Sequence, residues 1–487
     1  MTLSIALSLV SHTNVGKTTL ARTLLAQDIG EVRDAPHVTE FADEHQLLAL
    51  PGGETLCLWD TPGFGDTARL ARRLRGSDRP LGWFLGQVWD RVADRPFWAT
   101  QQALRHVRER SDVVLYLVNA AESPAAAGYV APEMELLSWV GKPVIVLLNQ
   151  LGAPRPAADE AADVQRWREH LAGSSLVRDV LPMDAFARCW VQELTLLAAV
   201  TRVFEPGPKR DAMAGLAAAW QRRREQQFEA AMTALAASLG RIAAARQPVA
   251  ETGLVGDAVR RLGRALGVPR AGEDPATAAQ QALAAALDEE VRAGTDELIR
   301  LHGLRGGAAP VVLQRVAEHF ELRLPLPEGR AAIFGGLLSG ALAGLKADVA
   351  SGGLTLGGGL LAGGVLGAIA GAGAARAVNL LRGLEQGTVG WSDAALTPMV
   401  EAALLRYLAV AHFGRGRGDW ELGESPPHWR AVVHGVLAAR QADWAELWRD
   451  RGDAQAMALA LQPLLAAATR AALRQLYPGA HADNRSP

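Results

Sequence analysis

Cysteine is scarce in this sequence of 487 residues, with only Cys57 and Cys189 present. Two cysteines cannot form the disulfide framework of a small secreted domain, so the composition favours a reducing cytosolic compartment. An excess of charge of one sign is also lacking, because 50 basic and 52 acidic side chains leave a formal net charge of -2. This balance argues against a protein whose main role is to bind nucleic acid.

Signals for metal binding and export are lacking as well. The histidines and acidic residues show no spacing typical of a metal site, such as HExxH. The apolar N-terminus has neither a basic segment nor a cleavage site, so we expect no signal peptide. What the sequence does have is length, since 487 residues with 49% hydrophobic content allow two to four domains with real cores.

An apolar segment, residues 3–10, leads into a motif that predicts a strand, a phosphate-binding loop and a helix. Binding of a triphosphate needs backbone N–H groups around the β-phosphate, an ammonium group and a hydroxyl ligand for Mg²⁺, which Gly16, Lys17 and Thr18 supply. Ser11 stands where the usual pattern has a glycine, and a polar turn is the alternative interpretation. The candidate nucleotide-binding residues of this motif are Ser11, Asn14, Val15, Gly16, Lys17, Thr18 and Thr19.

A second motif follows the short apolar segment 55–59 and has the sequence Asp60-Thr61-Pro62-Gly63. At the end of a strand, Asp60 would reach Mg²⁺ through a water molecule, and the Gly63 N–H would contact the γ-phosphate. An ordinary proline turn is the alternative. Because both motifs occur in the correct order, each at a predicted strand end, we expect nucleotide binding.

These motifs resemble those of the Era/TrmE-like branch of P-loop GTPases, which belongs to the TRAFAC class. The residues that carry the resemblance are Asn14-Val15-Gly16-Lys17-Thr18 and Asp60-Thr61-Pro62-Gly63-Phe64. The resemblance implies an α/β P-loop NTPase fold over residues 1–205, with a mostly parallel sheet and helices on both faces. It also implies GTP as the ligand and Mg²⁺ as the cofactor, held by Thr18, Asp60 and, in the loop between the motifs, Thr39.

The same resemblance implies where the guanine base lies. Asn149 follows the apolar segment 143–148 and matches the asparagine of the base-reading motif, and the backbone N–H of Ala185 is placed to meet the base oxygen. Gly152 stands where the family has an aspartate that pairs with two N–H donors of guanine, which a glycine cannot do. Preference for guanine therefore comes from the resemblance and not from a base-reading carboxylate.

Two further residues concern hydrolysis. Phe64 occupies the position at which Ras-type enzymes have the glutamine that orients the attacking water. In the resembled family such proteins often recruit K⁺ through an asparagine of the phosphate loop, here Asn14, whose alternative role is to tie the loop together by hydrogen bonds. We therefore expect slow intrinsic GTP hydrolysis. The candidate catalytic residues are Lys17, Thr39, Gly63 and Asn14.

The rest of the chain is predicted to be helical. Pro206-Gly207-Pro208 marks a domain boundary, after which residues 206–330 indicate a helical stalk or bundle and residues 383–487 a C-terminal helical region. One helix face is expected to carry Trp220, Phe228, Met232, Leu235 and Leu239. This layout is similar to that of bacterial proteins in which an Era/TrmE-like GTPase is joined to a C-terminal helical domain of unknown function.

Residues 331–382 predict a glycine-rich hydrophobic helical hairpin, that is, a glycine zipper. The glycines recur every four residues, at Gly336, Gly340 and Gly344 and again at Gly359, Gly363, Gly367 and Gly371. Such stripes let helices approach closely in lipid, and residues 349–375 carry no charge over more than the roughly 20 residues that cross a bilayer. The alternative is a glycine-rich hairpin buried inside a soluble bundle.

These observations lead to three functional hypotheses. The first is a slow GTPase switch at the cytoplasmic face of the membrane, with lipid contact through residues 331–375 and dimerisation with a second copy as a route of action. The second is a soluble GTPase that binds a protein or ribonucleoprotein partner. The third is a nucleotide-dependent scaffold that does not hydrolyse GTP. In each case the expected small ligand is a guanine nucleotide, and no direct nucleic-acid binding is indicated.

Overall fold

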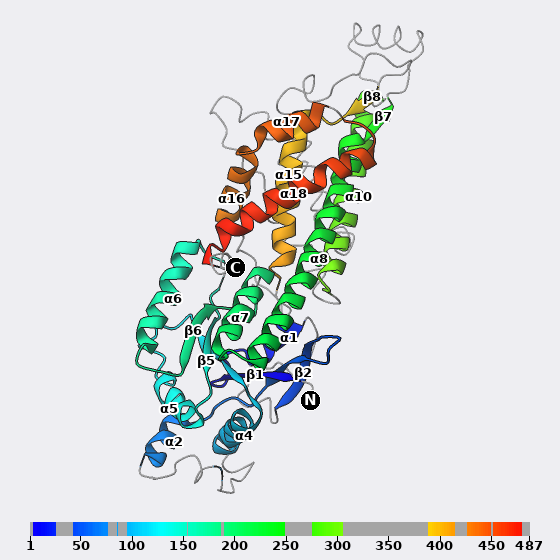
Figure 1. Cartoon of the computed structure of the whole chain (residues 1–487). Helices are drawn as coiled ribbons and strands as arrows, with labels where there is room; N and C mark the ends of the chain where they lie inside the picture. The colour runs from blue at the N-terminus through cyan, green and yellow to red at the C-terminus, as the bar shows by residue number, and fades with distance from the viewer. Residues whose placement is uncertain are drawn as a thin grey trace, which may run out of the picture. The chain divides into compact units, whose positions relative to one another are not determined.

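The structure is a computed structural model that describes residues 3–25, 42–75, 85, 95–152, 154–186, 189–248, 275–304, 388–413, 426–449 and 451–479. The chain forms two compact units (Figure 1). Unit 1 comprises Met1–Gln226, Ala411–His428 and Leu473–Pro487, and unit 2 comprises Gln227–Val410 and Trp429–Ala472.

Unit 1 is built on a six-stranded sheet with the order β2-β3-β1-β4-β5-β6. Its strands are β1 (Ser4–Ser11), β2 (Asp43–Ala49), β3 (Thr55–Asp60), β4 (Val113–Asn119), β5 (Val144–Asn149) and β6 (Val177–Pro182). All neighbouring strands are parallel except β2, which runs antiparallel to β3 at the sheet edge. The prediction of a mostly parallel sheet is therefore confirmed. The sheet is mixed because β2, a strand that was not predicted, is antiparallel to its neighbour.

Helices cover both faces of this sheet, as predicted. One face packs against α2 (Thr67–Leu74), α4 (Arg95–Arg110), α5 (Val130–Val140) and α6 (Ala157–Leu171). The other face packs against α1 (Lys17–Leu25), α7 (Trp190–Val203) and the first turns of α8 (Pro208–Ala244). Along β4, Val114 and Tyr116 belong to the first core while Val113 and Leu115 belong to the second. A parallel strand buried on both sides is apolar at consecutive positions for this reason.

The carboxyl ends of the five parallel strands meet at one edge of the sheet, because Leu9 of β1 pairs with Asp60 of β3 and Asn119 of β4 pairs with Asn149 of β5. In open α/β sheets ligands bind at this edge, in the loops that follow the strands. The fold therefore brings the phosphate-loop motif, the Asp60 motif and the Asn149 motif to the same side of the molecule.

Unit 2 contains most of its described residues in helices. These are the remainder of α8, then α10 (Pro275–Leu301), α15 (Asp393–Ala411), α16 (Pro427–Ala438), α17 (Gln441–Arg449) and α18 (Ala454–Leu476), some of which end in unit 1. The predicted apolar face of α8 is confirmed, since Phe228, Met232, Leu235 and Leu239 are buried.

The expectation of an all-α C-terminal region was wrong in one detail. A two-stranded antiparallel ribbon joins β7 (Arg246–Pro248) to β8 (Thr388–Gly390). Each strand has only three residues, which is too short for the alternating pattern that predicts a strand. More than a hundred positions also separate the two strands, so their pairing leaves no local signal in the sequence. The C-terminal region is mostly helical rather than wholly helical.

The glycine-rich segment 331–382 lies outside the described residues, so the predicted glycine zipper stays a prediction. Within the described part of the chain, one helix, α18, is long and apolar enough to cross a membrane by length and composition alone. Its inward side is packed in the protein core, where Leu461 and Leu465 are fully buried, and buried core helices commonly meet the same criteria. The described residues therefore give membrane insertion no support.

Candidate functional site

The phosphate-loop motif forms a tight turn between β1, which ends at Ser11, and α1, which begins at Lys17. Two of its residues have left-handed backbone conformations, Asn14 with φ 64° and Gly16 with φ 94°. A Cβ atom on Gly16 would lie 2.8 Å from the side-chain nitrogen of Asn149. Only glycine fits there, because both the backbone conformation and the approach of Asn149 exclude a side chain.

Lys17 is the buried cation of the site. Its ammonium group donates a hydrogen bond to the hydroxyl of Ser11 across 3.2 Å, so the serine that replaces the usual glycine holds the lysine in the loop. A Cβ atom on Gly63 would lie 3.1 Å from this ammonium group, which shows how closely the second motif approaches. Burial lowers the pKa of Lys17, and the carboxylates of Asp60 and Glu133 oppose that shift.

Thr18 and Asp60 lie together at the start of α1 and the end of β3. The Thr18 hydroxyl donates to Asp60 Oδ2 across 2.5 Å, while Asp60 Oδ1 is buried and has no hydrogen-bond partner among the described residues. Burial raises the pKa of Asp60, and Lys17 opposes this. A hydroxyl beside a carboxylate with one free oxygen suits a hard cation such as Mg²⁺. Thr39, the third predicted metal-binding residue, lies outside the described residues.

Asn149 connects the phosphate loop to the loop that follows β6. It is fully buried. Its side-chain nitrogen donates to the backbone carbonyl of Val15 across 2.6 Å, and its side-chain oxygen accepts from the backbone N–H of Ala185 at 2.8 Å. The neighbouring Gln150 reaches the carbonyl of Asn14 at 3.4 Å. The predicted base-binding residues and the phosphate loop therefore form one connected structure.

Asp184, next to the predicted base-loop residue Ala185, was not among the predicted binding residues. Its carboxylate accepts hydrogen bonds from the backbone N–H of Leu151 and from that of Phe186, each at 2.7 Å. It thus fastens the loop after β5 to the loop after β6. Gly152 has φ 81°, and a Cβ there would meet nothing within 4 Å, so the position of the missing family aspartate is open.

The remaining predicted residues differ in their surroundings. Val15 and Thr19 are buried in the loop and on α1. Asn14 is exposed and its side chain makes no hydrogen bond within the described part of the chain, so the loop-tying role weighed for it is not seen. Phe64 is buried in the core, and its backbone N–H donates to the Ser11 carbonyl at 2.9 Å. Its ring therefore packs away from solvent.

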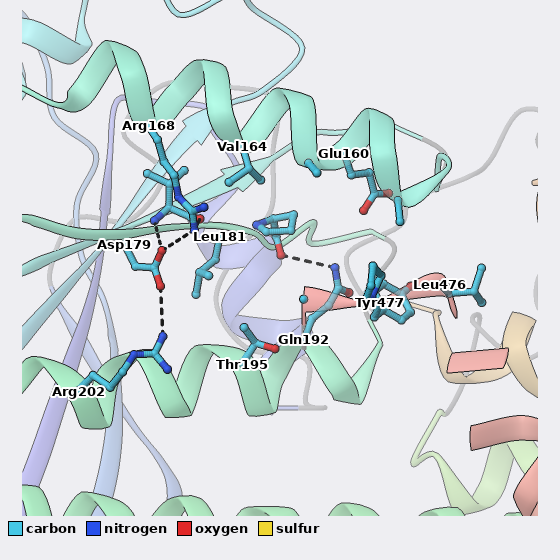
Figure 2. Close-up of a pocket in the computed structure, with 16 residues that line it drawn as sticks. Glu160, Val164, Arg168, Asp179, Leu181, Gln192, Thr195, Arg202, Leu476 and Tyr477 are labelled. Atoms are coloured by element: carbon cyan, nitrogen blue, oxygen red, sulfur yellow. Dashed lines mark hydrogen bonds and ion pairs between the residues drawn. The ribbon is translucent and has the colours of Figure 1, made fainter. Parts of the chain in front are cut away.

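A separate pocket of about 270 Å³ lies between α6, β6, α7 and residues 476–479 (Figure 2). At one end Asp179 binds Arg168 at 2.9 Å and Arg202 at 3.4 Å. Near the other end Gln192 donates to the Pro182 carbonyl at 3.5 Å. None of the predicted nucleotide-binding residues lines this pocket, so it is not the predicted site.

The N-terminal part of the chain is similar to a known protein family. Residues 6–150 match the model of a family described as 50S ribosome-binding GTPase. This range contains the phosphate loop, the Asp60 motif and Asn149. The N-terminal part is therefore similar to the P-loop GTPase domain of this family, while the helical C-terminal region is not covered by the match. Among curated proteins, none matches the sequence.

Two solved structures of Era are similar to part of the chain. The first is a complex of Era with MgGDPNP and a segment of 16S ribosomal RNA, at 17% identity and a TM-score of 0.32, covering 43% of this chain and 59% of that one. The second is a variant of Era from Aquifex aeolicus bound to GDP and AlF4⁻, at 19% identity and a TM-score of 0.31, covering 42% and 58%. This chain thus spans less than two thirds of either structure.

Proposed function

We propose that this protein binds GTP with Mg²⁺ at the edge of the sheet where the three motifs meet, and hydrolyses it slowly. The observation that carries the proposal is the double hydrogen bond of Asn149, which joins Val15 of the phosphate loop to Ala185 of the base loop. A nucleotide needs both its phosphates and its base held in fixed relation. The match of residues 6–150 to a GTPase family supports the same conclusion.

Each part of the phosphate site has a distinct role. The backbone N–H groups that begin α1 surround the β-phosphate, and the Lys17 ammonium lies between the β- and γ-phosphates. Thr18 and Asp60, with Thr39, would hold Mg²⁺, which neutralises charge on the phosphates. Gly63 sits against the Lys17 ammonium, where its backbone N–H can meet the γ-phosphate.

Slow hydrolysis follows from the position of Phe64. The ring is buried in the core, so no side chain at this position can orient the attacking water. Positioning then depends on backbone groups, Thr39 and Lys17. Asn14 is exposed in the phosphate loop, and we include a K⁺ held by its side chain, which would stabilise charge in place of an arginine finger.

The output of the GTPase domain is proposed to reach the helical region. A bound γ-phosphate orders the segments around Thr39 and Gly63, and its loss on hydrolysis releases them, as in other GTPase switches. The description of the matched family favours a ribosomal partner over the membrane surface first expected. Lipid contact through residues 331–375 and homodimerisation stay predictions, since that segment lies outside the described residues.

The test is a titration of the full-length protein with labelled GTP and ATP in Mg²⁺ and KCl, in which binding and phosphate release are followed together. We expect selective binding of GTP and slow release of phosphate. Tight GTP binding without phosphate release would support a scaffold that does not hydrolyse GTP. Equal or absent binding of the two nucleotides would contradict the proposal.

A further inference from the structure

Glu133 of α5 is a fully buried carboxylate beside the phosphate loop. It accepts hydrogen bonds from the Tyr116 hydroxyl at 2.6 Å, from His12 Nδ1 at 2.8 Å and from the Thr67 hydroxyl at 3.5 Å. Burial raises the pKa of Glu133, and the contacts with His12 and Tyr116 oppose this shift. A buried carboxylate is costly unless such donors satisfy it.

The partners of Glu133 come from the parts of the site that surround the γ-phosphate position. His12 belongs to the phosphate loop, and Thr67 is the first residue of α2, four positions after Gly63. Tyr116 is buried on β4, one of the two central strands of the sheet. One side chain therefore joins the phosphate loop and the α2 segment to the same fixed point.

His12 is held on several sides. Its ring stacks on that of Tyr129, with centroids 4.9 Å apart and planes inclined by 21°. Its backbone forms a parallel bridge with Phe64, which follows Gly63. The His12 ring thus has a defined position in which Nδ1 faces Glu133. A shift of the Glu133 side chain would therefore alter its contacts with both the phosphate loop and the start of α2.

We propose that Glu133 is a positioning residue that holds the phosphate loop, through His12, and the start of α2, through Thr67, in the arrangement that receives a γ-phosphate. The inference rests on the proposed GTPase function and extends it. GDP contacts the phosphate loop, whereas GTP also contacts the segment that contains Gly63. Loss of the link therefore weakens GTP binding more than GDP binding.

The test replaces Glu133 by glutamine in the full-length protein. Glu133→Gln keeps the size of the side chain but removes the charge and one of the two acceptor oxygens, so Tyr116 on one side and His12 with Thr67 on the other can no longer all donate to it. The matched control is Glu135→Gln on the same helix, where the partly exposed carboxylate binds Arg75 at 2.7 Å. Affinities for GDP and for a non-hydrolysable GTP analogue, kcat and the unfolding midpoint are measured for each protein.

We expect Glu133→Gln to lower the ratio of GTP-analogue affinity to GDP affinity by about tenfold, within the usual range for coupling between sites, and to lower kcat. Glu135→Gln should leave the ratio unchanged. His12→Gln breaks one of the two links and should lower the ratio less than Glu133→Gln does, and the double variant should be little worse than Glu133→Gln alone, because that change already breaks the His12 link. His12 is partly exposed, so this variant provides the test if Glu133→Gln does not fold.

Two results would overturn the inference. Equal losses of GDP and GTP-analogue affinity, or a lower unfolding midpoint with an unchanged ratio, would make Glu133 a purely structural residue. Additive effects of the His12 and Glu133 substitutions would show that they do not act through one link. If the parent protein itself binds no GTP, the proposed function fails instead, so the two failures are distinguishable.

Discussion

Asn149 donates a hydrogen bond from its side-chain amide to the backbone carbonyl of Val15, across 2.6 Å and a separation of 134 positions in the chain. The same amide group accepts from Ala185, so a single side chain fixes the distance between the phosphate loop and the base loop. Because the group is fully buried, no water can replace either bond. This relationship makes Asn149 the structural centre of the proposed nucleotide site.

Replacement of Asn149 by alanine should weaken both stability and nucleotide binding. The carbonyl of Val15 and the N–H of Ala185 would stay buried without partners, which costs about 1–3 kcal/mol for each group. Urea unfolding and GTP titration measure the two effects. The control is Asn119→Ala, at the paired position on β4, where the side chain binds the exposed Glu122 and the N–H of Ala121. Equal losses in both variants would contradict the special role of Asn149.

Lys17→Ala should abolish nucleotide binding. The ammonium group is the buried cation of the phosphate site, and charge-assisted bonds to phosphate are among the strongest polar contacts. We expect the affinity for labelled GTP to fall at least about 100-fold, the equivalent of two such bonds. Lys142→Ala, on the partly exposed turn before β5, is the control. A Lys17→Ala variant that binds GTP as tightly as the parent would show that the phosphate-loop assignment is wrong.

The parts of the site that could be predicted from sequence are those in which one residue type at one place is chemically required. The backbone turn at Gly16, the ammonium of Lys17 and the carboxylate of Asp60 are examples, and the apolar segments before them gave β1 and β3 nearly to the residue. Contacts that depend on tertiary packing left no such pattern. Glu133 is one of two acids in α5, and nothing in the sequence separates it from the partly exposed Glu135, while Asp184 was visible only as a neighbour of Ala185.

Strands β2, β7 and β8 were not predicted for the same reason, because they too depend on tertiary packing. β2 (Asp43–Ala49) is an exposed edge strand with mixed side chains, and a strand of this kind shows neither strict alternation nor a continuous apolar run. β7 and β8 exist only through their pairing with one another. The helices of the C-terminal region were more predictable, since their apolar residues recur with the helical period.

Gly152→Asp should restore a base-reading carboxylate. Nothing lies within 4 Å of a Cβ at this position, and aspartate tolerates the left-handed conformation at φ 81° better than most residues, at a cost of about 1 kcal/mol. We expect the ratio of GTP to ITP affinity to rise about tenfold, because ITP lacks the 2-amino group that the carboxylate would bind. Gly152→Ala carries the same backbone cost without the carboxylate. Equal ratios for the two variants would contradict the prediction.

Exchange of K⁺ for Na⁺ should slow hydrolysis if Asn14 holds the cation. The side chain is exposed beside the phosphate loop and makes no hydrogen bond to other described residues, so it is free to act as a ligand. Phosphate release is measured in each salt at constant ionic strength for the parent and for Asn14→Ala. We expect the parent to respond to the exchange and the variant not to respond. An unchanged rate in the parent would reject the role of K⁺.

His106 should make the GTPase domain less stable in acid. The ring lies on α4 against the Trp59 ring, with centroids 4.5 Å apart, and its Nε2 is 3.1 Å from the Ser8 hydroxyl. Burial, helped by the positive charge of Arg110, lowers the pKa of His106 from 6.5 to about 4. Between these two values the unfolded chain binds a proton that the folded protein does not. The contribution of neutral His106 to the free energy of unfolding is therefore fully present above pH 6.5 and is lost as the pH falls towards 4.

The loss can be isolated with His106→Gln, whose side chain does not titrate. From pH 7 to pH 4.5 we expect the free energy of unfolding of the parent to fall by about 1–3 kcal/mol more than that of the variant, allowing for partial solvent access to the ring. Buried acids such as Asp60 and Glu133 are common to both proteins, so their contributions cancel in the difference. The exposed His170 on α6 provides the control, and His170→Gln should behave like the parent. Parallel pH profiles for the parent and His106→Gln would mean that His106 titrates alike in the folded and unfolded states.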